Sequence, residues 1–203
     1  MYTTEYNTNK GFTLLEMLIA LSIFTIAIFI IMATLFAITN VQKKIIALQS
    51  AQDNLRFAFE SMTKEIRTGK RFHCGTSGTL TAPLDCPFPN GGNSFTFQNA
   101  LLQTATYQVV NINGVGVLVK SSNGALPDCA SGSYINCQKL TSPDLVIVNT
   151  VNFYVRGSGA NDHAQSLATI VLEGEVQDPV KKIGTAKLFL QTTISKRGLL
   201  DQP

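Results

Sequence analysis

The chain has few of the residues on which most enzyme and nucleic-acid sites depend. Only 14% of its 203 residues are charged, the formal net charge is +3, and there are two histidines, His73 and His163. Neither histidine lies in a His-Glu-x-x-His or nucleophile-elbow sequence, and no phosphate-cradling glycine loop is present. No Lys/Arg cluster alternates with aromatic residues, so direct nucleic-acid binding has little support. The sequence therefore predicts neither an enzyme nor a cofactor.

One active-site alternative stays open, because catalytic triads are assembled in space and not along the sequence. It would place Ser158 or Ser166 beside His163 and Asp162. An exposed loop over 157–165 accounts for these residues better. Calcium binding of the EF-hand type is not indicated, because four aspartates of the region beyond the helix are too scattered to form such a site: Asp128, Asp144, Asp162 and Asp178.

Glycine and proline are both absent from Phe12 to Thr68. Because these residues interrupt secondary structure so strongly, a gap of this length predicts one continuous helix. At 1.5 Å per residue such a helix would be about 85 Å long, whereas the hydrocarbon core of a bilayer is about 30 Å thick. About half of it must therefore stand outside the bilayer. We expect a membrane half over 12–39 and an amphipathic half over 40–69.

The outer half carries an apolar stripe at helical spacing, formed by Ile45, Leu48, Leu55, Phe59, Met62 and Ile66. We expect this stripe to pack on the chain's own head domain, with coiled-coil pairing to a neighbour as the alternative. Gly69 follows in a position suited to a helix C-cap.

Basic residues and histidine are absent between Phe12 and Thr39, yet one carboxylate, Glu16, lies there. A charged side chain within a bilayer costs at least about 2.5 kcal/mol, so Glu16 needs a partner. The partner must come from another molecule or from a chain terminus, and cleavage after Gly11 would free the Phe12 amine. A secretory signal peptide fits poorly, because the apolar run is too long and no Ala-x-Ala site follows it. An ordinary signal anchor is the alternative.

The segment Lys10-Gly11-Phe12-Thr13-Leu14-Leu15-Glu16 follows a short polar leader and resembles the processing and methylation motif of type IV pilins and type II secretion pseudopilins. The resemblance implies a leader over 1–11, cleavage after Gly11 by a prepilin peptidase, and N-methylation of Phe12. It also implies that Glu16 neutralises the terminal amine of a neighbouring subunit during assembly. The implied partners are other pilin or pseudopilin subunits, the inner-membrane assembly platform and the membrane.

Two further features favour a minor, tip-located subunit. Major pilins commonly carry a proline midway along the hydrophobic stretch, and the sequence Ile31-Met32-Ala33-Thr34 has none. The segment 51–67 resembles the corresponding part of J- or W-type minor pilins and pseudopilins. Whether the machine serves DNA uptake, secretion, adhesion or motility stays open.

Four cysteines, Cys74, Cys86, Cys129 and Cys137, lie beyond the membrane half. An even number in loop-like stretches predicts disulfides in an oxidising compartment. Local pairing, Cys74 with Cys86 and Cys129 with Cys137, is the simplest of three connectivities, and the other two stay open. A zinc site is the alternative, but neither pair has Cys-x-x-Cys spacing, and no metal is expected.

Beyond Phe72 the pattern changes to short alternating runs, which predict strands at Ser94–Gln98, Ala105–Val110, Val115–Lys120, Leu145–Val155, Ala168–Val176 and Ala186–Ile194. Asn113-Gly114 predicts a hairpin turn. Cys74–Gly92 and Ser121–Ser142 are expected to be disulfide-pinned loops. The fold class expected is α+β: a long N-terminal helix packed on an antiparallel β-sheet head over 70–203, whose apolar face covers the helix stripe.

Together these features predict a structural subunit of a type IV pilus or a type II secretion-like pseudopilus. It would be a single-pass membrane protein before assembly and would hold its head outside the cytoplasm afterwards. The resemblance to pilins implies that its N-terminus lies inside, because the charges flanking the apolar run, Lys10 on one side and Lys43 and Lys44 on the other, do not follow the usual positive-inside bias. The alternative from another class is an unprocessed, membrane-anchored binding or adhesion domain, and an anchored exported enzyme comes third.

Overall fold

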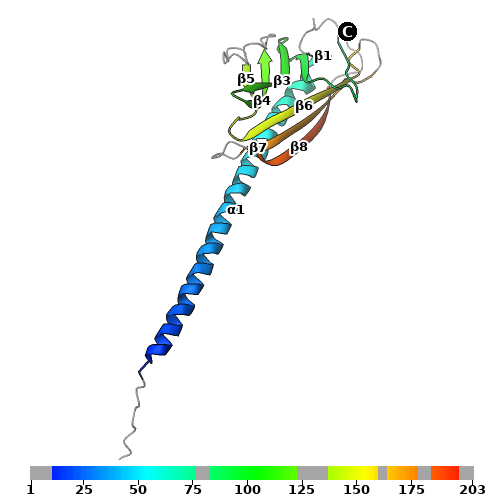
Figure 1. Cartoon of the computed structure of the whole chain (residues 1–203). Helices are drawn as coiled ribbons and strands as arrows, with labels where there is room; N and C mark the ends of the chain where they lie inside the picture. The colour runs from blue at the N-terminus through cyan, green and yellow to red at the C-terminus, as the bar shows by residue number, and fades with distance from the viewer. Residues whose placement is uncertain (1–10, 76–82, 123–136, 160–163, 178–183, 197–203) are drawn as a thin grey trace, which may run out of the picture. The chain divides into compact units, whose positions relative to one another are not determined.

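The computed structural model describes residues 11–75, 83–122, 137–159, 164–177 and 184–196 (Figure 1). The chain divides into two compact units, one up to Ile45 and one from Ile46 onward. Helix α1 (Leu14–Thr68) begins in the first unit and ends in the second. Its unbroken course over 55 residues confirms the helix that the missing glycine and proline predict.

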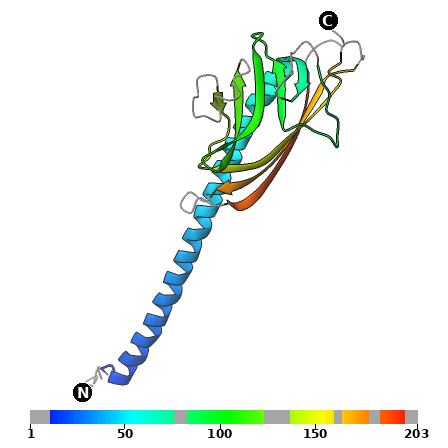
Figure 2. The same ribbon diagram turned by 45° about the horizontal axis from the view of Figure 1, so that its top comes forward.

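The second unit combines the end of α1 with two antiparallel sheets (Figure 2). The five-stranded sheet runs in the order β1 (Lys70–Cys74), β2 (Ser94–Gln98), β3 (Thr104–Ile112), β4 (Val115–Ser122) and β5 (Cys137–Lys139). The three-stranded sheet runs in the order β6 (Val146–Arg156), β7 (Leu167–Gln177) and β8 (Gly184–Ser195). The α+β class is confirmed, but the head contains two sheets and not the one that was expected.

One hydrophobic core joins the helix to both sheets. The helix buries Ala51, Leu55, Ala58, Phe59, Met62 and Ile66, and these contact buried residues from the two sheets, among them Phe97, Tyr107, Phe153 and Ile170. Among the described residues, five stacked or edge-on rings form its aromatic part: Phe72, Phe95, Phe97, Tyr107 and Phe153. The prediction that the helix stripe packs on the chain's own head is therefore correct.

Two predictions about the outer half of the helix need correction, the burial of Ile45 and the C-cap at Gly69. Ile45 is exposed, because the buried stripe begins only at Ala51. Gly69 follows the last helical residue as expected, but it is not in the left-handed conformation of a helix C-cap. A side chain at this position would clash with the Phe97 ring, so Gly69 is required for packing.

The six predicted strands all exist, with ends that differ by at most two residues. Asn113 and Gly114 both have positive φ angles, as a type I′ hairpin turn requires, and the turn joins β3 to β4. Two strands were not predicted. β1 starts before the strand region was expected to begin, and β5 lies inside Ser121–Ser142, which was interpreted as a loop.

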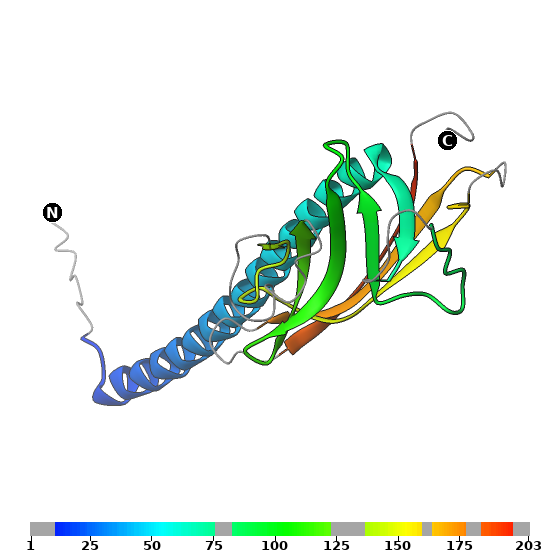
Figure 3. The same ribbon diagram turned by 90° about the horizontal axis from the view of Figure 1, so that it is seen from above.

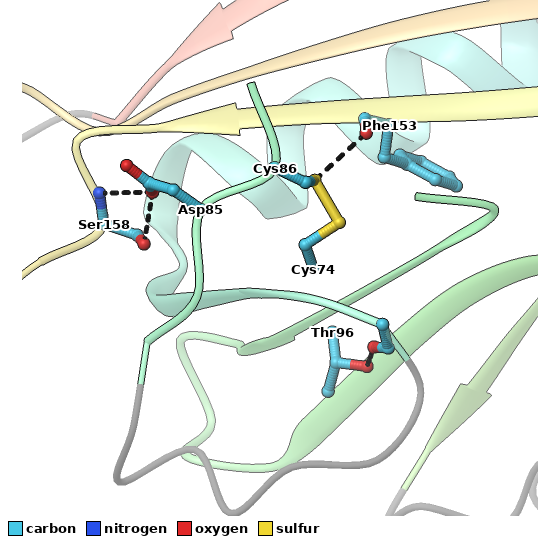
Figure 4. Close-up of a disulfide and its surroundings, with 7 residues drawn as sticks. Cys74, Asp85, Cys86, Thr96, Phe153 and Ser158 are labelled. Carbon is cyan, nitrogen blue, oxygen red and sulfur yellow. Dashed lines mark hydrogen bonds between the residues drawn. A yellow bond between two sulfur atoms is a disulfide. The ribbon is translucent and has the colours of Figure 1, made fainter. Parts of the chain in front are cut away.

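A disulfide joins Cys74 to Cys86, the pair that local connectivity predicts (Figure 4). It ties the end of β1 to the segment that leads into β2. Cys137 is also disulfide-bonded, but Cys129 lies outside the described residues, so that pairing stays a prediction. Asp85 lies next to Cys86 and accepts hydrogen bonds from the backbone N–H groups of Gly157 and Ser158, both at 3.0 Å, which fixes the same segment to the end of β6.

A half-buried carboxylate, Glu65, ties the end of α1 to the five-stranded sheet. Its Oε1 accepts hydrogen bonds from Lys120 Nζ at 2.7 Å and from Asn99 Nδ2 at 3.2 Å. Its Oε2 accepts one from the Tyr107 hydroxyl at 2.5 Å. Burial alone would raise the pKa of the Glu65 carboxyl, but the three donors and the Lys120 charge outweigh it and hold that pKa below its usual value. Burial and the Glu65 charge together raise the pKa of Tyr107.

We predict that Glu65→Gln lowers the free energy of unfolding by about 2 kcal/mol, because it leaves the Lys120 ammonium without its charged partner. Glu60→Gln is the matched control on the same helix. Glu60 pairs with Arg56, and their side chains are 56% and 79% exposed, so its loss should cost under about 0.5 kcal/mol. Denaturant titrations of the full chain in detergent measure both values.

The same pair of variants gives a pH test. The folded-state pKa of Glu65 is depressed, so its contribution is complete above the unfolded pKa of about 4.3 and is lost as pH falls through the lower folded pKa. Acidification should therefore destabilise the wild type more than Glu65→Gln. Equal pH dependence in the two proteins would contradict the stabilising role of this carboxylate.

We predict that replacing Cys74 and Cys86 together by serine lowers the free energy of unfolding by about 2–4 kcal/mol, because the denatured chain regains the freedom of the closed loop. The non-reduced wild type should show no thiol that reacts under native conditions. Reactive thiol at either position in the folded protein would contradict the bridge.

Candidate functional site

The first helical turn of α1 is capped by Thr13. The Thr13 side-chain oxygen accepts the backbone N–H of Glu16 at 3.2 Å, and the Thr13 carbonyl accepts that of Met17, also at 3.2 Å. Thr13 is therefore the N-cap and Glu16 is the third helical residue, the positions of threonine and glutamate in a capping box. The motif that predicts processing thus also sets the start of the helix.

The helix starts directly after its N-cap, Thr13, so Gly11 and Phe12 lie before it in non-helical backbone. The Phe12 side chain is 78% exposed, and a side chain at Gly11 would meet no described atom within 4 Å. The bond between the two residues is therefore open to an extended-chain protease site. These two residues and Glu16 are the site predicted from the sequence, and they lie together at the helix start.

The apolar part of α1 is uncovered. None of its most apolar stretch is buried, and the helix is long and apolar enough to cross a membrane. Each of its hydroxyl side chains hydrogen-bonds to a backbone carbonyl three residues earlier: Ser22, Thr25, Thr34 and Thr39. These polar groups are satisfied within the helix, as hydrocarbon surroundings require.

Glu16 is the exception within this stretch. Its side chain is exposed, and among the described residues none donates a hydrogen bond to its carboxylate or forms an ion pair with it. Its location in the first turn is favourable, since the positive end of the helix dipole lies there. The Thr13 cap was not predicted from the sequence, although Thr-x-x-Glu before an apolar run is a known sign of a helix start.

The residues of the active-site alternative have other roles where the structure describes them. The Ser158 hydroxyl donates to Asp85, and the Ser166 hydroxyl donates to the Gly157 carbonyl at 2.7 Å. Figure 4 shows Ser158 held against Asp85. Asp162 and His163 lie outside the described residues. Within the described part of the chain, no three His, Cys, Asp or Glu side chains gather in a way that could hold a metal ion.

Comparison with known proteins bears on the N-terminal segment. Residues 6–32 match the family model described as the prokaryotic N-terminal methylation motif. No curated protein and no solved structure matches the chain. The match includes the exposed Gly11–Phe12 bond, the Thr13 cap and Glu16, together with much of the uncovered apolar helix. The chain thus carries the prokaryotic N-terminal methylation motif ahead of a pilin-like α+β fold.

Proposed function

We propose that this protein is a minor subunit of a type IV pilus or a type II secretion-like pseudopilus, processed after Gly11 and assembled through α1. The observation that carries the proposal is the helix start. An exposed Gly11–Phe12 bond lies directly ahead of a capped, uncovered apolar helix, whose one carboxylate, Glu16, has no side-chain partner in the described part of the chain. A filament supplies both things that this helix lacks, apolar neighbours and a cation.

In this proposal a peptidase hydrolyses the Gly11–Phe12 peptide bond, and the new Phe12 amine is methylated. In water the attraction between an ammonium and a carboxylate is weak. In the apolar surroundings between subunits it is strong, so the Phe12 amine of one subunit can pair with the Glu16 carboxylate of its neighbour. Glu16 therefore sets the register of assembly. The missing proline at Ile31–Thr34 and the helix segment 51–67 support the minor-subunit assignment.

The competing function is a membrane-anchored binding domain that is never processed and never polymerises. It keeps the same helix and head but leaves Met1 on the mature chain. Cleavage and incorporation are the two steps that distinguish the proposals.

We predict that Gly11→Val blocks processing, because a β-branched side chain restricts the backbone at a bond that the peptidase must approach closely. Intact-mass measurement of membrane-extracted wild type should show the loss of residues 1–11 and the gain of one methyl group. The variant should keep Met1 and its full mass. A wild-type protein that retains Met1 at its site of function would exclude the pilin proposal.

We predict that Glu16→Gln is processed and folds normally but is poorly incorporated into filaments. Glutamine also suits the third position of a capping box, so the change removes the charge and retains the cap. Asp53→Asn is the matched control, since it neutralises an exposed carboxylate of the same helix outside the apolar stretch. Co-purification of tagged protein with the sheared filament measures incorporation. Undiminished recovery of Glu16→Gln would overturn the pairing with the Phe12 amine.

A further inference from the structure

The sheet β6–β7–β8 has one face in the core and one face outside it. Val151, Phe153 and Val155 of β6 are buried, as are Ala168, Ile170 and Leu172 of β7. The alternate residues form the outer face, where Tyr154, Thr169 and Thr193 lie in one row across the three strands and Asn152, Val171 and Gln191 in the next. A depression of about 560 Å³ lies on this outer face.

The segment that follows the Cys74–Cys86 disulfide brings an aromatic ring to this depression. It pairs with the free edge of β6 at two points, Cys86 with Val155 and Gly92 with Phe153, each through two backbone hydrogen bonds. Between these points the segment bulges away from the edge and carries Phe88. Figure 3, in which this green segment lies beside yellow β6, shows the arrangement from above.

Phe88 and Tyr154 form an aromatic platform. Their ring centroids are 5.7 Å apart, and Phe88 is 71% exposed. Gly91 lies so close to the Tyr154 ring that any side chain there would clash with it, so the bulge encloses this ring on a second side. The disulfide, the two backbone pairings and Asp85 hold the platform in place before any ligand arrives.

The polar groups around the platform define the ligand chemistry. Arg156 and Gln191 line the same depression and provide hydrogen-bond donors, and both are exposed. Among the described residues, no carboxylate pairs with Arg156. A guanidinium with no carboxylate partner among the described residues favours a ligand that carries a carboxylate, which it can bind through two parallel hydrogen bonds.

The charge distribution disfavours a nucleic acid on this face. A single strand carries one phosphate per nucleotide and needs a groove lined by several cations. Of the described residues that line the depression, Arg156 alone is a cation, and the same outer face continues along β7 to Glu173 and Glu175. A chain of sugars has a lower charge density, presents flat apolar C–H faces to aromatic rings and offers hydroxyls to amide groups.

We propose that this face binds an acidic oligosaccharide, with sugar rings stacked on Phe88 and Tyr154 and a uronate carboxylate held by Arg156. The site goes beyond the role of the chain in assembly, since none of its residues belongs to α1. It would give the head of the subunit a ligand of its own.

The test titrates the full chain in detergent micelles with trigalacturonic acid and, for comparison, with neutral maltotriose. We expect saturable binding of the acidic sugar that weakens with salt. Phe88→Ala should weaken it by about 3- to 10-fold through lost stacking, and Arg156→Gln by at least about 10-fold. Arg156→Gln should also remove the preference for the acidic over the neutral sugar.

Matched controls lie on the same sheet. Phe189→Ala removes a ring that is 69% exposed but lies outside the depression, and Lys187→Gln removes a cation outside it. Both should leave the affinity unchanged. The proposal fails if trigalacturonic acid does not bind, if Phe189→Ala weakens binding as much as Phe88→Ala, or if an oligothymidylate binds more tightly than the sugar. It also fails if Phe88 mediates self-association that the sugar does not displace, since the face would then be a subunit contact.

Discussion

The fold depends on one backbone that must satisfy its own hydrogen bonds over the whole of α1. In hydrocarbon no water replaces a missing backbone partner, so a glycine or proline interruption within the apolar stretch would be costly. The four hydroxyl side chains of this stretch follow the same rule, since each donates to the turn before it. Internal satisfaction makes the helix continuous, and its continuity lets a single element serve both as apolar anchor and as part of a packed core.

The head packs on the C-terminal part of α1, where the buried helix residues run from Ala51 to Ile66. Ala51 and Ala58 are fully buried, and such small residues allow the sheets to approach the helix closely while Leu55, Met62 and Ile66 fill the space between them. Gly69 serves the same purpose at the helix end, where the Phe97 ring takes the place of a side chain. The core therefore depends on the helix as much as on the strands.

The sequence predicts the parts of this fold that repeat locally. The helix follows from the absence of glycine and proline, and six strands follow from the alternation of apolar and polar residues. In β7, for example, the apolar Ile170, Leu172 and Val176 face the core. The missed strands lack such a signal. β1 has the sequence Lys-Arg-Phe-His-Cys and β5 has three residues, so each forms because β2 or β4 offers an edge to pair with.

The polar sites likewise divide into those with a local sequence signal and those formed by residues far apart in the chain. The Thr13 cap can be read from two residues three positions apart, but the partners of Glu65 lie 34, 42 and 55 positions away in the chain. Nothing in a local pattern indicates that Asn99, Tyr107 and Lys120 converge on one carboxylate. The aromatic platform is equally non-local, because Phe88 and Tyr154 meet only where the disulfide-linked segment pairs with β6.

Two glutamates of α1 show how surroundings decide what a carboxylate does. Glu65 has three donors from its own chain, which hold its pKa low and make it a structural tie between helix and sheet. Glu16 is on the same helix but receives no side-chain donor from any described residue. A carboxylate in apolar surroundings must be neutralised or paired. Glu65 meets that requirement by folding, and in the proposed filament Glu16 meets it only by assembly, so the same residue type stabilises the subunit at one position and selects its neighbour at the other.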